Sequence, residues 1–164
     1  MRFSPLVLML GLATSTIAIP AAGQRPDSQI SPRSIEFAKR GEAALAAGNY
    51  IAADDALETA LILDPRNRAA FRTMARVAMK QRLFGQAIRL TNKALALEPG
   101  DRDALALQGE AMVEAGAVPR ARDTLAKLQK LCAGPCPQAA ALSAAIARGP
   151  AMAAVKPATA KKVN

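Results

Sequence analysis

An internal repeat with a period of about 34 residues constrains this chain more than any other feature of its sequence. Positions one period apart carry identical or similar side chains in several columns. The clearest columns are Ala53, Ala87 and Ala121; Leu63, Leu97 and Leu131; Phe37, Phe71 and Leu105; and Tyr50, Phe84 and Val118. The repeat predicts three units, at residues 34–67, 68–101 and 102–135. A motif of this length cannot bury its apolar face alone, so we expect the units to stack against one another.

Each unit divides into two segments of helical character. The breaks fall at Gly48-Asn49, Arg82-Leu83 and Gly116-Ala117. In the second unit Phe71, Met74, Ala75 and Ala78 recur at the spacing of one helix face. Hydrophobic residues make up 51% of the chain, dominated by Ala and Leu, with four Phe, one Tyr and no Trp. This composition favours closely packed helices over a β-sandwich, so the sequence predicts an all-α fold, an α-solenoid.

A further column holds only tiny residues, which are Gly41, Ala75 and Gly109. We expect this column to let a second helix approach the first one closely. Pro65 and Pro99 are predicted to end one unit and to open the first helical turn of the next, a position that suits proline. Ser31-Pro32 is predicted to act in the same way at the start, as N-cap and first helical residue.

These columns resemble the tetratricopeptide repeat (TPR) family over about residues 34–131. The residues that carry the resemblance are Gly41, Ala53, Ala60 and Pro65; Ala75, Ala87, Ala94 and Pro99; and Gly109 and Ala121. The chain departs from the family pattern at Arg40, Thr91, Gln108, Leu128 and Ala133. The resemblance implies stacked helix pairs whose first helices line a concave groove for a protein or peptide partner.

Two cysteines follow the third unit, and Pro137 opens a further helical stretch. This stretch, within 136–149, is predicted to cap the exposed end of the solenoid. Cys132 and Cys136 fit a structural disulfide, a redox-active pair or half of a metal site. Three residues lie between them instead of the two of a C-x-x-C motif, and the chain has no His and no second cysteine pair. We therefore expect a disulfide, provided that the chain is exported to an oxidising compartment.

Export is predicted from the first 23 residues. Arg2 is followed by an apolar run from Leu6 to Ile19, then by Pro20 and the small residues 21–23. This pattern is typical of a cleaved signal peptide, and the run is shorter than the ~20 residues of a membrane-spanning helix. A membrane anchor is the alternative reading. Residues 24–33 read as a linker and residues 150–164 as a disordered basic tail. The predicted location is the periplasm or the extracellular medium.

Composition excludes most catalytic sites. Without histidine the chain has no Ser-His-Asp, Cys-His or H-E-x-x-H arrangement, and it contains no glycine-rich phosphate loop. We therefore expect neither an enzyme nor a bound cofactor or metal. The formal net charge of +9 would suit nucleic acid. Predicted export and the lack of interleaved aromatic residues argue against that partner.

The candidate binding residues lie on the first helix of the second unit, where Arg68, Arg72, Arg76 and Lys80 recur every four residues. The resemblance implies that the groove column across the units is Glu42, Arg76 and Glu110. Arg76 is expected to pair with both acids in a ladder, whereas Arg72 and Lys80 have no acidic neighbour one turn away. A basic groove for an acidic or C-terminal peptide is the competing reading. The candidate groove residues are Arg72, Arg76, Met79 and Lys80.

Ala38 and Glu42 do not supply the Lys and Asn that the family's chaperone-tail clamp needs, so that activity is not predicted. The sequence predicts a periplasmic scaffold or adaptor that binds a protein or peptide without catalysis. An accessory factor in cell-envelope or cell-wall assembly, acting on a polymer, is the alternative.

Overall fold

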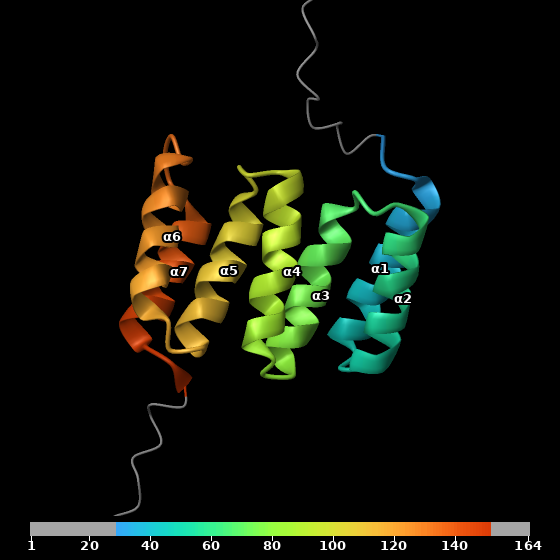
Figure 1. Cartoon of the computed structure of the whole chain (residues 1–164), viewed down its shortest axis with the longest axis horizontal. Helices are drawn as coiled ribbons and strands as arrows, with labels where there is room; N and C mark the ends of the chain where they lie inside the picture. The colour runs from blue at the N-terminus through green and yellow to red at the C-terminus, as the bar shows by residue number, and fades with distance from the viewer. Residues whose placement is uncertain (1–28, 152–164) are drawn as a thin grey trace, which may run out of the picture.

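The computed structural model describes residues 29–151, and in this range the chain forms seven helices and no strand (Figure 1). The helices are α1 (Pro32–Ala46), α2 (Tyr50–Leu63), α3 (Arg68–Lys80), α4 (Phe84–Leu97), α5 (Arg102–Glu114), α6 (Val118–Lys130) and α7 (Pro137–Arg148). They stand side by side from α1 and α2 at one end to α6 and α7 at the other (Figure 1). The predicted all-α solenoid is confirmed.

The helices form an inner and an outer row. In the inner row α1 contacts α3, α3 contacts α5, and α5 contacts α7. The outer helices α2, α4 and α6 pack against their inner neighbours before and after them in the chain. Because the inner helices touch one another more extensively than the outer ones do, the stack curves with the inner row on its concave side.

The tiny-residue column works as predicted at Gly41. A Cβ added to Gly41 would lie 2.5 Å from Leu57 Cγ and 3.2 Å from the carbonyl oxygen of Ala53, both on α2. Ala53 and Leu57 are fully buried there. Glycine thus lets the second helix pack directly on the backbone of the first. At Gly109 the close neighbour is instead Leu142 of the capping helix, at 2.5 Å.

The turn inside each helix pair contains one residue with positive φ. These residues are Gly48 at 75°, Arg82 at 62° and Gly116 at 77°. They are one repeat period apart and lie at the predicted breaks. Left-handed backbone costs a glycine almost nothing but strains a residue with a Cβ. The second unit therefore carries a strained arginine where the other two have glycine.

The first residues of the helices differ in part from the prediction for the prolines. Ser31 is the N-cap of α1 and Pro32 its first residue, but the Ser31 hydroxyl makes no capping bond. Pro65 and Pro99 lie in the turns ahead of α3 and α5 and not in their first helical turns. The N-caps of those two helices are Asn67 and Asp101. Their side chains accept hydrogen bonds from backbone N–H groups in the first helical turn.

The C-terminal end of the stack is closed by α7. Its side chains Ala139, Leu142 and Ala145 are buried, and Ala139 and Leu142 pack in one cluster with Leu105 and Leu128. Cys132 and Cys136 form a disulfide in the loop that leads into α7, as expected. Closing a loop of five residues stabilises the fold by about 2 kcal/mol on chain-entropy grounds.

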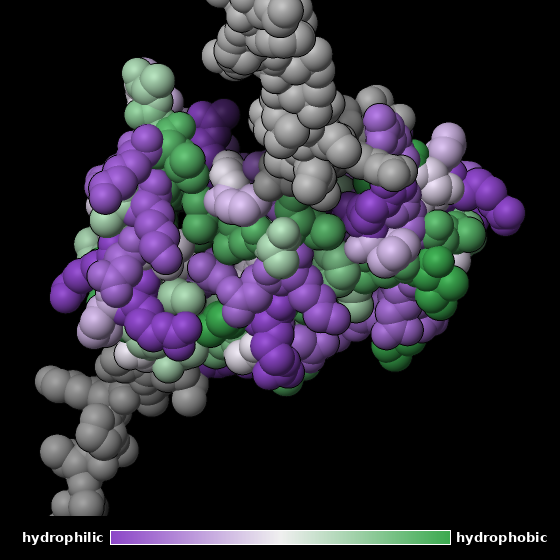
Figure 2. All heavy atoms as spheres, turned by 45° about the horizontal axis from the view of Figure 1, so that its top comes forward, coloured by the Kyte–Doolittle hydropathy of each residue, from purple (hydrophilic) through white to green (hydrophobic). Residues whose placement is uncertain are grey.

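The predicted signal peptide (1–23), most of the linker (24–28) and the tail beyond Ala151 lie outside the described residues. None of the helices between residues 29 and 151 has the length and apolar character to cross a membrane. Hydrophilic side chains gather over the α6 end of the face in Figure 2. The exposed cations of α6 there are Arg120, Arg122, Lys127 and Lys130.

Candidate partner-binding groove

The inner row carries a groove that opens on its concave side. Its first hollow has a volume of about 540 Å³ and reaches from α1 across α3 to α5. Four apolar side chains contribute to its lining, which are Leu45, Met79, Phe84 and Leu107. A second hollow of about 300 Å³ continues to α7 and shares Arg76, Leu107 and Glu110 with the first. We call the two hollows together the groove.

Charged residues line the apolar part of the first hollow. Arg76, Lys80 and Arg82 bring three cations, and Glu110 and Glu114 bring two carboxylates. The three cations are exposed, so they are free to face a ligand. Arg82 is the residue with the strained positive φ, and strain of this kind often marks functional positions. The hollow can therefore hold apolar side chains and counter a carboxylate at the same time.

Glu110 lies at the junction of the two hollows. It is half-buried, and burial raises the pKa of its carboxyl above the usual value. The positive charges of Arg148 on α7 and Arg76 on α3 act in the opposite direction, while Glu114 adds to the rise. A cationic or hydrogen-bond-donating group of a ligand would find a receptive oxygen at this point.

Three of the four predicted site residues line the groove, and the fourth does not. Arg76, Met79 and Lys80 line the groove, as their helix face suggested. Arg72 does not line it, and the expectation that it lacks a partner is wrong. Its Nη1 lies 2.6 Å from Asp101 Oδ2, and the Asp101 side chain is only 4% exposed. The same edge holds an ion pair between Arg68 and Glu98 at 3.4 Å. Arg72 therefore joins α3 to the start of α5.

The expected ladder of Glu42, Arg76 and Glu110 is present only in part. Arg76 acts on Glu110 through its charge. Glu42 instead accepts a hydrogen bond from Thr73 Oγ1 at 3.2 Å. Within residues 29–151, no ion pair of 4.0 Å or less joins Arg76 to either acid. The Arg76 guanidinium is thus available at the surface of the groove.

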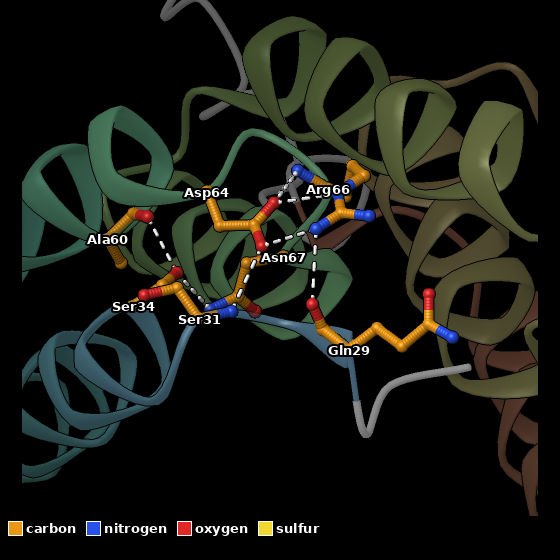
Figure 3. Close-up of polar contacts among 7 residues, drawn as sticks. All are labelled: Gln29, Ser31, Ser34, Ala60, Asp64, Arg66 and Asn67. Atoms are coloured by element: carbon orange, nitrogen blue, oxygen red, sulfur yellow. Dashed lines mark hydrogen bonds and ion pairs between the residues drawn. The ribbon is translucent and has the colours of Figure 1, made fainter. Parts of the chain in front are cut away.

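A polar cluster at the first junction between units joins the start of α1 to the turn ahead of α3 (Figure 3). Asp64 is buried and accepts hydrogen bonds from the Ser31 backbone N–H at 3.0 Å and from Arg66 Nη2 at 2.9 Å. These bonds, above all those from Arg66, lower the pKa of Asp64 to about 2. Beside it, Asn67 donates to the Ser34 hydroxyl, which donates to the Ala60 carbonyl. The cluster fixes α1 against α3.

Solved structures of other proteins share this architecture. A TPR domain of yeast Sti1, in a complex with pHsp70, has a TM-score of 0.66 and 18% identity over 72% of this chain and 98% of that domain. The second TPR domain of human RPAP3, in complex with an Hsp70 peptide, has a TM-score of 0.62 and 20% identity, covering 69% and 94%. This chain has the TPR fold. Neither a protein-family model nor a curated protein sequence matches it.

The TPR fold also occurs inside larger proteins. The O-GlcNAc transferase of Thermobaculum terrenum has a TM-score of 0.62 and 22% identity over 70% of this chain. This chain spans only 22% of that transferase. The resemblance read from the repeat columns is confirmed at the level of the fold.

Sequence reasoning missed several groove residues of this TPR chain. Leu45, Phe84 and Leu107 come from α1, α4 and α5, and only the stacking of these helices with α3 brings them together. Phe84 belongs to a repeat column, which was a usable signal. Glu114 gave no signal, because its role depends on where the chain returns after α7. There its Oε2 accepts a hydrogen bond from the backbone N–H of Ala151 at 3.0 Å.

Proposed function

We propose that this chain is a protein-interaction module that binds a peptide segment of a partner in its groove. The observation that carries the proposal is the hollow of about 540 Å³ with apolar lining and three exposed cations. Apolar anchors in a pocket supply most of the affinity in such interfaces, while charges at the edge steer and orient the partner.

The chemistry of the groove defines the partner class. Met79, Phe84 and Leu107 accept an apolar side chain, and Arg76, Lys80 and Arg82 counter a nearby carboxylate. We therefore propose a segment that carries an apolar anchor next to acidic residues. The likeness to peptide-bound TPR domains supports a peptide ligand, since the RPAP3 domain holds the peptide SGPTIEEVD.

The proposal includes binding without catalysis, in the periplasm or outside the cell. The described side chains of the first hollow are apolar, cationic or carboxylate, and the sequence supplies no histidine to act as a general base. Export is proposed on the sequence alone, from the apolar run Leu6 to Ile19 and the small residues 21–23.

The test is affinity capture from an envelope extract with three forms of the protein. The groove variant is Arg76→Glu with Lys80→Glu. The matched control is Arg120→Glu with Arg122→Glu, which makes the same change in charge on exposed residues of the outer helix α6. A partner is expected to be retained by the wild type and the control, and to be lost by the groove variant.

Salt dependence tests whether the groove cations contribute to partner binding. Retention of the partner should weaken at higher salt in the wild type, because the cations contribute steering and orientation. A partner that all three forms retain equally would place binding outside the groove. If purified cell wall captures the chain and no protein does, the polymer-binding alternative replaces this proposal.

A further inference from the structure

The chain leaves the described fold from the wall of the groove. Ala151 lines the first hollow together with Leu45, Met79 and Leu107. Its backbone N–H donates to Glu114 Oε2 at 3.0 Å, which fixes it on α5. The thirteen residues that follow in this sequence, 152–164, therefore start at the groove and not on the outer face.

The turn after α7 accounts for this exit. The helix ends at Arg148, and Gly149 has a φ of 72°, a conformation that glycine adopts without strain. Pro150 follows and prevents the helix from continuing. Gly149 and Pro150 thus turn the chain back across the end of α5, where Glu114 receives Ala151.

The first residues beyond Ala151 match the lining of the hollow. Met152, Ala153, Ala154 and Val155 are uncharged, and charge begins only at Lys156. The apolar side chains that line the hollow are Leu45, Met79, Phe84 and Leu107. A flexible Met and a compact Val suit an irregular apolar surface of this kind.

The segment is long enough to cross the groove. Thirteen extended residues reach about 43 Å at ~3.3 Å per residue. Neighbouring helix axes lie about 8–10 Å apart, so α1 lies roughly 24–30 Å from α7 along the inner row. The segment can therefore cover the first hollow with residues to spare.

We propose that residues 152–164 occupy the groove as an intramolecular ligand, with Met152 to Val155 against its apolar lining. This inference rests on the proposed function, because a partner peptide would use the same surface and would have to displace the segment. Attachment at Ala151 gives the segment an effective concentration in the millimolar range, so a weak contact is enough for the segment to occupy the groove.

The charges of the segment and of the groove predict how its docking depends on salt. Lys156, Lys161 and Lys162 meet two carboxylates, Glu110 and Glu114, but also three cations of the same hollow. The attraction to the carboxylates and the repulsion from the cations oppose one another. Apolar contact is therefore the main contribution to docking of the segment. Occupation of the groove by the segment should be insensitive to salt, unlike the capture of an acidic partner.

The test compares amide NMR spectra of the chain and of four altered forms. Truncation after Ala151 should shift the amide signals of Met79, Lys80 and Leu107, which lie on α3 and α5. Met152→Asp with Val155→Asp in the full chain should produce the same shifts. The matched control, Ala126→Asp with Gln129→Asp on exposed positions of α6, changes the net charge equally outside the segment and the groove, and it should leave the groove signals as in the wild type. Lys80→Ala serves to assign the Lys80 signal.

Added as a synthetic peptide, residues 152–164 should return the groove signals of the truncated chain toward those of the full chain. Shifts confined to Glu114 and α7 would overturn the inference, since they report only the lost neighbour of Ala151. Unchanged groove signals in the Met152 and Val155 variant would overturn it as well.

The two proposals fail separately. Partner capture is repeated with the truncated chain, whose groove would be open. Groove shifts without any captured partner would support the tail contact and contradict the proposed function. A captured partner with no groove shifts would do the reverse. If both hold, the truncated chain should retain several-fold more partner than the full chain.

Discussion

Gly109 of α5 packs directly against the side chain of Leu142 of α7. A Cβ added to Gly109 would come within 2.6 Å of both methyl carbons of Leu142 and 3.1 Å of its Cγ. Leu142 is completely buried, so it has little room to move away. The missing side chain of Gly109 is therefore what allows the capping helix to lie against α5. The same relation joins Gly41 to Leu57 at the other end of the solenoid.

Alanine at Gly109 is expected to destabilise the fold by about 1–3 kcal/mol, as overpacking of a tight contact does. Gly41→Ala should behave similarly. Gly85→Ala is the matched control, because the nearest atom to its Cβ would be Arg89 Nη1 at 3.8 Å. There alanine should raise stability by up to about 1 kcal/mol through helix propensity. Urea unfolding of the three variants checks this, and equal effects at all three sites would contradict the packing account.

The sequence predicted the parts of this fold that repeat. The repeat period located the helix pairs and the tiny-residue column, because each repeated contact leaves its mark in every unit. Contacts made once leave no such mark. Arg72 and Asp101 are 29 residues apart, so a search for partners one helical turn away could not pair them. Ala151 reached the groove through a turn whose direction only the structure gives.

Arg72 and Asp101 should be coupled in a double-mutant cycle. Asp101→Asn removes the charge but keeps a residue that caps α5 well, and Arg72→Ala removes the guanidinium. The pair is partly buried, with side chains 24% and 4% exposed. We expect a coupling energy of about 1–2 kcal/mol, between surface pairs and buried charged hydrogen bonds. Lys80→Ala, on an exposed side chain of the same helix, should leave the free energy of unfolding nearly unchanged. A coupling near zero would mean that the contact adds no stability.

Arg82 should show opposing effects on stability and binding. Replacing it with glycine relieves the strain of a φ of 62° and should raise stability by up to about 1 kcal/mol. Arg82→Ala removes the same charge but keeps a Cβ, so it should not gain this stability. Both variants should weaken capture of an acidic partner to the same extent if the guanidinium contacts it. Equal stability of the two variants would show that the turn is unstrained.

Asp64 should make stability depend on pH in the acid range. Its pKa is lowered to about 2 in the folded protein, chiefly by hydrogen bonds from Arg66. A lowered folded-state pKa means that the unfolded state binds the proton more readily. The stabilisation is therefore complete above the unfolded value of 3.8 and is lost as the pH falls toward 2. It amounts to at most about 2 kcal/mol, and less after solvent screening, since the Arg66 side chain is 39% exposed.

Asp64→Asn isolates this contribution from the other carboxylates. At pH 7 the variant should be less stable than the wild type by about 1–2 kcal/mol. The gap between the two stabilities should narrow between pH 4 and pH 2, because the wild-type carboxyl takes up its proton over this range. Asp123→Asn, an exposed residue of α6, makes the same change in charge and should follow the wild-type curve. The measurement is urea unfolding at several pH values. A gap between Asp64→Asn and the wild type that persists unchanged at pH 2 would show that the amide disrupts packing and not the ion pair.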